Sequence, residues 1–366
     1  MDVNFGANVT NCGIIFDANG NYSYRALTQS NIWIHGNNWN GMVIFPNGLS
    51  YGRISYSGNF NKRIVLPKAV TNTTNIFVNC FVLNQNIQIP NSVTNAAFMF
   101  TNCRNLNQNI QIPNSVTSTA SMFANCRNLN QNIQIPNSVT NVTYMFANCW
   151  KLNQDIQIPN SVTNVTYMFA SCLNLNQNIQ IPNGVTTAVS MFSACSNLNQ
   201  NIQIPNRVTN ETYMFKGCRN LNQNIQIPSN ITNMASMFAG CQTLNQNIQI
   251  PNGVTDVASM FTGCHNLNQN IQIPSSVKNI ANVFALCSNL SNITIDPTER
   301  TVPNTNSFVR SFNYKSLNIW TDSDTATNIM NAGFIHGNIK PTMETITNGY
   351  YNAYYNVYIY TNTTFN

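Results

Sequence analysis

The sequence has very little charge. Only 7% of its 366 residues are Asp, Glu, Lys or Arg, against a usual share of ~25%, and the net charge is +6. Lys and Arg do not cluster anywhere, so the chain has no basic patch that would neutralise a phosphate backbone. No run of 18 or more apolar residues is present either. We therefore expect neither nucleic-acid binding nor membrane insertion.

Groups of residues that carry catalysis or bind metals are also lacking. The three histidines, His35, His265 and His336, stand in unrelated contexts, and the acidic residues are scattered singly. There is no C-x-x-C pair to begin a zinc site and no Gly-rich phosphate loop. The sequence thus predicts a protein without catalytic residues, cofactor or metal.

One short segment resembles the start of a calcium-binding loop, with Asp17, Asn19 and Asn21 as the possible ligands. Gly20 falls at the fourth place of that loop rather than the sixth, and Thr28 stands where the final Glu is required. A hairpin turn built on Asn19-Gly20 is the better interpretation.

What the sequence has in abundance is repetition. Eleven prolines follow one another at intervals of 23 residues, namely Pro67, Pro90, Pro113, Pro136, Pro159, Pro182, Pro205, Pro228, Pro251, Pro274 and Pro297. Ten cysteines keep the same interval: Cys80, Cys103, Cys126, Cys149, Cys172, Cys195, Cys218, Cys241, Cys264 and Cys287. A period of this length indicates stacked supersecondary units, so we predict a solenoid of ten 23-residue repeats.

The spacing of apolar residues within one repeat predicts which side chains face the core. Phe146, Cys149 and Leu152 recur every third position, as on one face of a short helical or 3₁₀ turn. Ile156 and Ile158 alternate with Gln157, as in a strand, and Pro159 ends that strand. We expect the strands of successive repeats to stack ~4.8 Å apart as a narrow parallel sheet.

Asn and Gln fill the positions around this strand. In the first repeat they are Asn84, Gln85, Asn86 and Gln88, and the pattern recurs almost unchanged up to Asn268, Gln269, Asn270 and Gln272. An amide both donates and accepts, so identical amides stacked from repeat to repeat can satisfy one another without charge. We predict such amide ladders between coils.

The repeat resembles that of the BspA-like leucine-rich-repeat surface proteins, over roughly residues 67–297. Met145, Phe146, Cys149 and Leu152 match the turn of that family; the strand and the segment after it are matched by Ile156, Ile158, Pro159, Ser161, Val162 and Thr163. Three residues rather than two separate Leu152 from the first Ile of the strand. The resemblance implies a leucine-rich-repeat solenoid. It also implies a role in adhesion, since members are typically bacterial or parasite surface proteins, and similar repeats occur in bacteriophage-encoded proteins.

Both ends of the array depart from the 23-residue period. We predict an irregular β-rich N-terminal cap over residues 1–66, the solenoid over 67–297, and a degenerate repeat with a Tyr-rich β region over 298–366. In the cap, Ile44-Phe45-Pro46 echoes the end of a repeat strand, and Val65-Leu66-Pro67 echoes it again 21 residues later. After the array, Leu317–Trp320 has the pattern of one more strand.

The C-terminal region ends in an alternating segment, residues 355–360, which predicts a strand with one apolar face. An unpaired strand edge invites pairing with another chain. The segment is therefore either part of the cap or a strand that docks another chain and mediates assembly or homo-oligomerisation. The residues assigned to this strand are Tyr355, Val357, Tyr358 and Tyr360.

The ten periodic cysteines all belong to the predicted core column. Disulfide formation requires Cβ atoms ~3.8 Å apart and turned toward each other, which parallel neighbours in a column do not provide. We expect free, buried thiols that act as small apolar side chains. Cys12 stands outside the column, and the sequence assigns it no role.

Two surfaces of the array are candidates for recognition. One is the uniform row of Gln88, Gln111, Gln134 and Gln157, along which a periodic ligand such as a polysaccharide can form hydrogen bonds. The other consists of positions that vary between repeats, directly after each Cys and directly before each Met-Phe pair. Arg, Trp and Tyr are frequent binding anchors. The candidates at the varied positions are Arg104, Arg127, Trp150, Arg219, His265, Tyr144, Tyr167 and Tyr213.

The sequence favours a non-enzymatic structural and binding protein. The N-terminal residues 1–5 lack the basic and apolar regions of a signal peptide, and reduced thiols fit assembly in the cytosol. The first hypothesis is therefore a bacteriophage virion component, from the tail or capsid surface, whose partners are other virion proteins or a host surface protein or glycan. Two alternatives are a bacterial cell-surface adhesin and an intracellular interaction scaffold.

Overall fold

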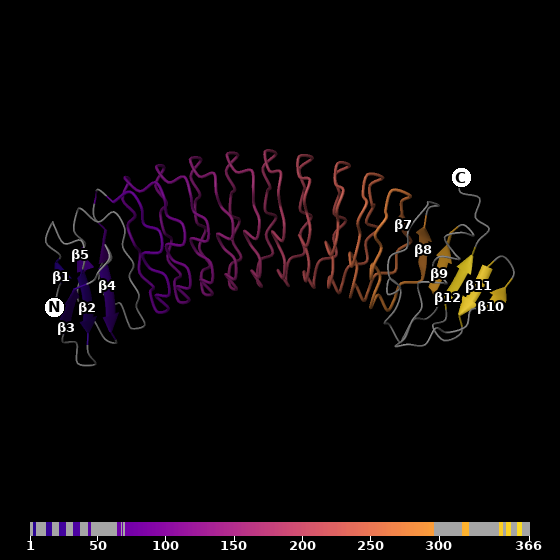
Figure 1. The fold of residues 1–366 in the computed structure, drawn as a ribbon, viewed down its shortest axis with the longest axis horizontal. Helices are drawn as coiled ribbons and strands as arrows, with labels where there is room; N and C mark the ends of the chain where they lie inside the picture. Colours follow the sequence, from indigo (N-terminus) through magenta and orange to yellow (C-terminus); the bar gives the residue numbers. More distant parts are fainter. Residues whose placement is uncertain are drawn as a thin grey trace. The chain divides into compact units, whose positions relative to one another are not determined.

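The computed structural model describes the repeat array almost completely, together with short strands on either side of it. The described residues are 3–4, 12–16, 22–26, 32–36, 43–44, 64–66, 68, 70–295, 317–321, 344–346, 349–352 and 357–360. The chain divides into two compact units, Met1–Gly184 and Val185–Asn366. This division falls inside the array, so each unit contains a set of stacked coils (Figure 1).

The first unit begins with two small sheets. Its strands are β1 (Val3–Asn4), β2 (Cys12–Phe16), β3 (Tyr22–Ala26), β4 (Ile32–Gly36), β5 (Val43–Ile44) and β6 (Ile64–Val65). β5 pairs in parallel with both β1 and β6, and β2 lies between β3 and β4. The register Val43↔Ile64 reproduces the predicted 21-residue echo. β2 and β3 are antiparallel with Phe16 opposite Tyr22, as the predicted hairpin requires; its turn lies outside the described residues.

The predicted core columns are confirmed. In the repeat that begins at Pro136, the side chains of Val139, Phe146, Cys149, Leu152 and Ile156 are fully buried. Met145 is buried as well and fills the space beside the Phe column, as expected from the sequence. The Phe rings of successive coils lie parallel, with centroids 5.4–5.7 Å apart in the first unit and 5.7–6.0 Å apart in the second.

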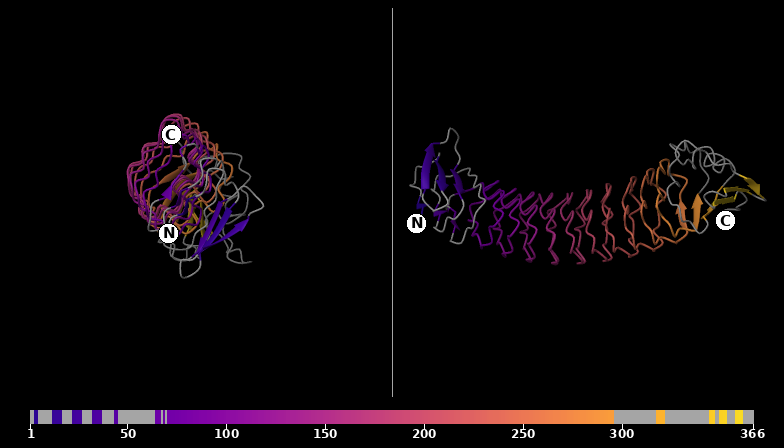
Figure 2. Two further views of the ribbon diagram at one scale, coloured as in Figure 1. Left: turned by 90° about the vertical axis from the view of Figure 1, so that its left-hand side faces the viewer. Right: turned by 90° about the horizontal axis from the view of Figure 1, so that it is seen from below.

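The segment before each Cys joins neighbouring coils through the backbone. Within residues 73–79, every second N–H group donates to a carbonyl of the following coil, for example Phe77 N to Met99 O at 2.9 Å. The N–H groups of Ile76, Val78 and Cys80 donate to the third residue back in their own coil, as Cys80 does to Phe77 at 3.1 Å. The segment is therefore a run of tight turns, and Figure 2 shows such coils side by side in each unit.

The predicted helical turn is present only as single turns that bond to the third residue back, and no helix occurs among the described residues. The segment carries two residues with positive φ in each coil, such as Tyr144 (56°) and Asn148 (61°), and this left-handed conformation interrupts a right-handed helix. Asn occupies the second of these positions in the early coils, and Gly217, Gly240 and Gly263 occupy it later. Asn and Gly are the residues that adopt positive φ most readily.

Side chains that the repeat pattern did not explain fix the ends of these turns. Asn95 accepts a hydrogen bond from the Ala97 backbone N–H at 3.0 Å, an Asx turn that opens the segment. The Ser of the N-S-V-T motif donates to the preceding coil, as Ser161 Oγ does to Val139 O at 2.6 Å. These bonds give the Asn and Ser positions of the repeat a structural role.

The continuous parallel sheet predicted for the Ile-Gln-Ile segments is realised only at the C-terminal end of the array. Among the described repeats, this segment forms a strand only at β7 (Ile271–Ile273). In an earlier repeat the N–H of Ile110 bonds to Gln108 O of its own coil. The inter-coil backbone hydrogen bonds of the repeats run instead through the turn segment, as from Phe100 N to Met122 O at 2.8 Å.

The predicted Asn and Gln positions include one column with hydrogen bonds between coils and one without. Asn84 Oδ1 accepts from the Asn107 backbone N–H at 2.9 Å and from Gln108 Nε2 at 3.1 Å, both in the next coil. Gln88 Nε2 instead donates to Asn86 in its own coil at 3.4 Å. The inter-coil contact thus joins an Asn to a backbone N–H and a Gln, rather than joining identical amides.

The second unit ends in a mixed sheet of six strands. They are β7, β8 (Asn292–Ile295), β9 (Leu317–Trp320), β10 (Glu344–Ile346), β11 (Gly349–Asn352) and β12 (Val357–Tyr360), in the order β10-β11-β12-β9-β8-β7. The strand predicted at Leu317–Trp320 is confirmed as β9. β12 pairs with β11 on one side and β9 on the other, so the open edge expected of a docking strand is absent there. Tyr355 lies outside the described residues.

Candidate binding surface

Four successive positions after the cysteines of the first unit form a stripe in which two arginines, Arg104 and Arg127, lie between two aromatic residues, Phe81 and Trp150. Backbone hydrogen bonds keep these positions in register from coil to coil. In one of them, the N–H of Asn128, the residue after Arg127, donates to Arg104 O in the preceding coil at 3.0 Å. The Arg104 guanidinium lies 4.7 Å from the Phe81 ring centroid, and that of Arg127 lies 3.9 Å from the Trp150 ring. We call these four residues the aromatic–arginine stripe.

Arg127 is held more tightly than Arg104. Its side chain is half-buried, whereas that of Arg104 is exposed. Its Nε atom is buried and has no hydrogen-bond partner within the described part of the chain. The charge is stabilised by the face of Trp150, whose side chain remains 37% exposed. The stripe therefore presents a pre-ordered cation and a large aromatic surface to solvent.

The tyrosines before the Met-Phe pairs stand at the first left-handed position of each turn. Tyr144 and Tyr167 have φ values of 56° and 53°, and their rings stack with centroids 4.6 Å apart. Ser or Asn occupies this position in most other described coils, for example Ser121 and Asn282. A bulky residue with positive φ is uncommon and strained. Tyr144 is 43% exposed, so little burial offsets that strain.

The candidate binding residues of the second unit do not contact one another. Lys216 Nζ lies 5.0 Å from the ring centroid of Tyr213, a contact that the sequence pattern did not predict. The side chains of Arg219 and His265 are exposed, and neither forms a hydrogen bond, ion pair or ring contact with the described residues. The structure thus groups Arg127 with Trp150 and Tyr144 with Tyr167, but brings Arg219 and His265 to no common site.

The uniform Gln row also lies at the surface. Gln157 and Gln180 line a shallow hollow of about 300 Å³ in the first unit, beside Pro159 and Pro182. Its lining consists of the Ile, Gln, Pro and Asn that recur in most repeats, with no distinctive side chain. It offers regular hydrogen-bonding groups rather than anchors for one specific partner.

The cysteine column confirms the prediction of free, buried thiols. All ten array cysteines are unbridged and buried. Most of these thiols donate a hydrogen bond to the Phe carbonyl of the preceding coil, as Cys149 Sγ does to Phe123 O at 3.1 Å. Burial raises the pKa of the Cys287 thiol to about 12 and raises that of Cys149 well above its usual value. These thiols are therefore unsuited to act as nucleophiles or metal ligands.

One carboxyl group is buried without compensation. Glu211 occupies a core column filled by Ala188 in the preceding coil and Met234 in the following one, and its side chain is fully buried. Neither carboxyl oxygen has a hydrogen-bond partner within the described residues. Desolvation raises its pKa to about 8. No sequence pattern predicted this burial, because Glu211 has the appearance of an ordinary polar turn residue.

The described residues contain neither a membrane-spanning nor a metal-binding feature. No helix that is long and apolar enough to cross a bilayer occurs among them. They also hold no group of three or more His, Cys, Asp or Glu side chains arranged to bind a metal ion.

Two family models match the chain. A model described as a BspA type leucine rich repeat region matches residues 120–245 and 211–340, which together cover more than half of the chain. A model described as a Mycoplasma protein of unknown function matches residues 58–159. A search of the curated proteins finds no match.

Solved structures of bacterial proteins align with this chain. The pneumococcal vaccine antigen PcpA aligns with a TM-score of 0.52 at 16% identity, covering 87% of this chain and 80% of its own. A leucine-rich repeat protein from Bacteroides ovatus aligns with a TM-score of 0.49 at 19% identity, covering 85% of this chain and 84% of its own. At these identities the likeness to the pneumococcal antigen shows the fold alone.

Proposed function

We propose, because this chain belongs to the BspA-type leucine-rich-repeat family, that the protein is a non-enzymatic binding protein displayed on a bacterial cell surface. Family members are typically surface proteins used in adhesion. The family therefore favours the adhesin hypothesis over the virion component that the sequence placed first. No structural observation favours the virion component or the intracellular scaffold specifically.

The observation that carries the proposal is the aromatic–arginine stripe. Regular columns of Asn, Phe and Cys maintain the stack, whereas the stripe varies from coil to coil and exposes Trp150 and Arg104. Arg and Trp dominate binding energy at protein interfaces because they combine a large apolar surface with directed hydrogen bonds. The Arg127–Trp150 contact reduces the entropy that these side chains would lose on binding.

Surface display is tested first in the organism that produces the protein. Protease added to intact cells should remove the protein, while a cytosolic marker survives until the cells are lysed. Protection of the protein in intact cells would contradict the proposal.

The recognition surface is tested with the purified chain. Fluorescently labelled protein should bind intact host or bacterial cells in a panel, and the triple variant Arg104→Ala, Arg127→Ala, Trp150→Ala should bind at least tenfold more weakly. Arg207→Ala and Phe98→Ala, exposed residues outside the stripe, serve as matched controls and should bind normally. Equal binding by the triple variant would place recognition elsewhere on the array.

A further inference from the structure

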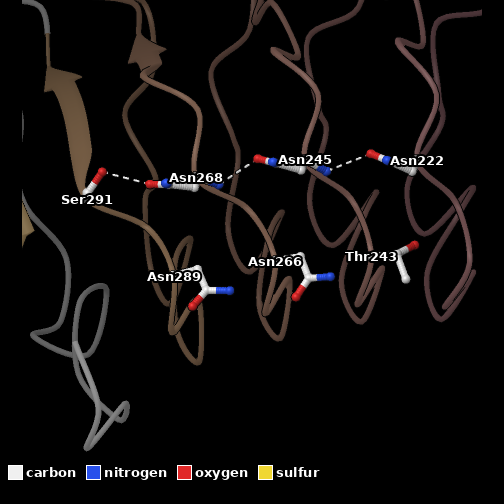
Figure 3. Close-up of a pocket in the computed structure, with 7 residues that line it drawn as sticks. All are labelled: Asn222, Thr243, Asn245, Asn266, Asn268, Asn289 and Ser291. Atoms are coloured by element: carbon white, nitrogen blue, oxygen red, sulfur yellow. Dashed lines mark hydrogen bonds between the residues drawn. The ribbon is translucent and has the colours of Figure 1, made fainter. Parts of the chain in front are cut away.

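A polar groove crosses the coils of the second unit. It has a volume of about 510 Å³ and is lined by two rows of side chains (Figure 3). The first row consists of Asn222, Asn245, Asn268 and Ser291, and the second of Thr243, Asn266 and Asn289. All of these described lining residues are uncharged.

The first row presents hydrogen-bond donors. Asn245 Oδ1 accepts from the Asn268 backbone N–H at 2.9 Å and from Gln269 Nε2 at 3.2 Å. Asn222 Oδ1 accepts the equivalent pair from the Asn245 N–H and Gln246. Because these carbonyl oxygens are occupied, the amide NH₂ groups remain as the donors available to a ligand.

The second row differs from its counterparts elsewhere in the array. In earlier coils of the same unit, Asn220 Nδ2 bonds to Asn197 Oδ1 at 3.4 Å, so two amides of this column engage each other. The side chains of Asn266 and Asn289, in the same column, are exposed and form no hydrogen bond with the described residues. Both side-chain amides therefore remain available to a ligand along the groove.

We propose that this groove binds a linear, uncharged polysaccharide. Sugar hydroxyl oxygens accept from amide NH₂ groups, and hydroxyl hydrogens donate to the free carbonyls of Asn266 and Asn289. The first row places an Asn in each of three successive coils, and the Phe rings of the same unit show that these coils repeat every 5.7–6.0 Å, so successive sugars of one chain meet similar partners. The volume lies within the range of ligand pockets.

The chemistry of the groove disfavours other polymers. Without a charged side chain among its described lining residues, it has no counter-charge for an acidic polysaccharide. Peptide recognition gains its specificity from pockets for alternate side chains, and no aromatic or aliphatic anchor is part of this lining. The proposal adds a second site to the aromatic–arginine stripe and does not depend on the proposed function.

The groove is tested by affinity electrophoresis of the full chain in native gels that contain dextran, amylose, mannan or laminarin, with heparin and an unstructured peptide mixture as competitors. At least one neutral polysaccharide should retard the protein. The variant Asn266→Ala, Asn289→Ala should bind it at least tenfold more weakly, with an unchanged melting temperature because these side chains have no internal partner.

The matched control is Asn197→Ala, Asn220→Ala, which removes amides of the same column outside the groove and should bind normally. The stripe variant should also bind normally, which separates this site from the proposed recognition surface. Absence of retardation by every neutral polysaccharide would overturn the proposal. So would unchanged binding by the Asn266/Asn289 variant, or displacement by the peptide mixture or by heparin, which would assign the groove to another ligand.

Discussion

The guanidinium carbon of Arg127 lies 3.9 Å from the ring centroid of Trp150, a residue one coil further along the array. The contact links positions 23 residues apart in sequence, at the surface rather than in the core. It depends on the backbone register of the coils, because Lys151 N donates to Arg127 O at 3.1 Å directly beside it.

This contact predicts an energetic coupling between the two residues. A double-mutant cycle with Arg127→Ala and Trp150→Ala should give a coupling of ~0.5–1 kcal/mol in the free energy of unfolding, the strength of a partly exposed cation–π pair. Urea denaturation measures it. The pair Arg127→Ala and Tyr213→Ala, which shares no contact, should be additive. Additivity of the first pair would mean that the contact does not form in solution.

The buried thiols predict resistance to alkylation. Under native conditions iodoacetamide should leave all ten array cysteines unmodified, because burial both blocks access and raises the pKa of thiols such as Cys149. In denaturant without reductant, the same ten should react. Mass spectrometry of the modified peptides gives the count. Rapid modification of several array thiols in the native protein would contradict the core column.

The two faces of the turn predict unequal effects of substitution. Phe169 is fully buried and its ring lies 5.7 Å from that of Phe146, so Phe169→Ala should lower the free energy of unfolding by ~3–5 kcal/mol. Tyr167→Ala should change it by less than ~1 kcal/mol, since the residue is partly exposed and loses little beyond its stack with Tyr144. Denaturation midpoints compare them, and equal losses would show that the faces are wrongly assigned.

The uncompensated carboxyl group predicts that stability falls as pH rises. The pKa of Glu211 is raised from 4.5 to about 8 in the folded chain, so the folded state binds the proton more tightly than the unfolded state. Its contribution to stability is complete below about pH 4.5 and is lost progressively as pH rises to about 8. Unfolding free energies at pH 5 and pH 8 should therefore differ more in the wild type than in Glu211→Gln.

Glu211→Val provides the companion test, because Val142 and Val165 fill the same core column in the first unit. This variant should be more stable than the wild type at pH 8, since an apolar residue replaces an unpartnered carboxylate. A pH dependence that persists unchanged in both variants would assign the titration to another group.

The left-handed turn position predicts a stabilising substitution at Leu286. This residue has φ of 61°, a conformation disfavoured for a branched aliphatic side chain, and is 43% exposed. Leu286→Asn should raise the free energy of unfolding by up to about 1 kcal/mol, because Asn tolerates this conformation. The reverse type of change, Gly240→Leu, should destabilise the protein. A melting temperature lowered by Leu286→Asn would show that Leu286 makes a compensating contact.

The sequence by itself determined the repeat, the core columns and the state of the cysteines. Side chains such as Phe146 and Cys149 recur every 23 residues, and a recurring apolar position in a solenoid must face the shared core. The 21-residue echo before the array likewise agrees with the register in which β5 and β6 pair. These features follow from periodicity alone, and periodicity can be recognised in the sequence without knowledge of the structure.

Only the tertiary structure decided how the coils are joined and which side chains remain unpaired. The positive φ of Tyr144 and Asn148 replaces the expected helical turn, and the inter-coil hydrogen bonds run through that turn rather than along the Ile-Gln-Ile segments. The pairing of β12 on both sides, the isolation of Glu211 and the free amides of Asn266 and Asn289 also depend on neighbours from other coils. The physical reason is that the sequence cannot distinguish an Asn whose amide is hydrogen-bonded from one whose amide is free. The backbone geometry around each Asn decides which of the two it is.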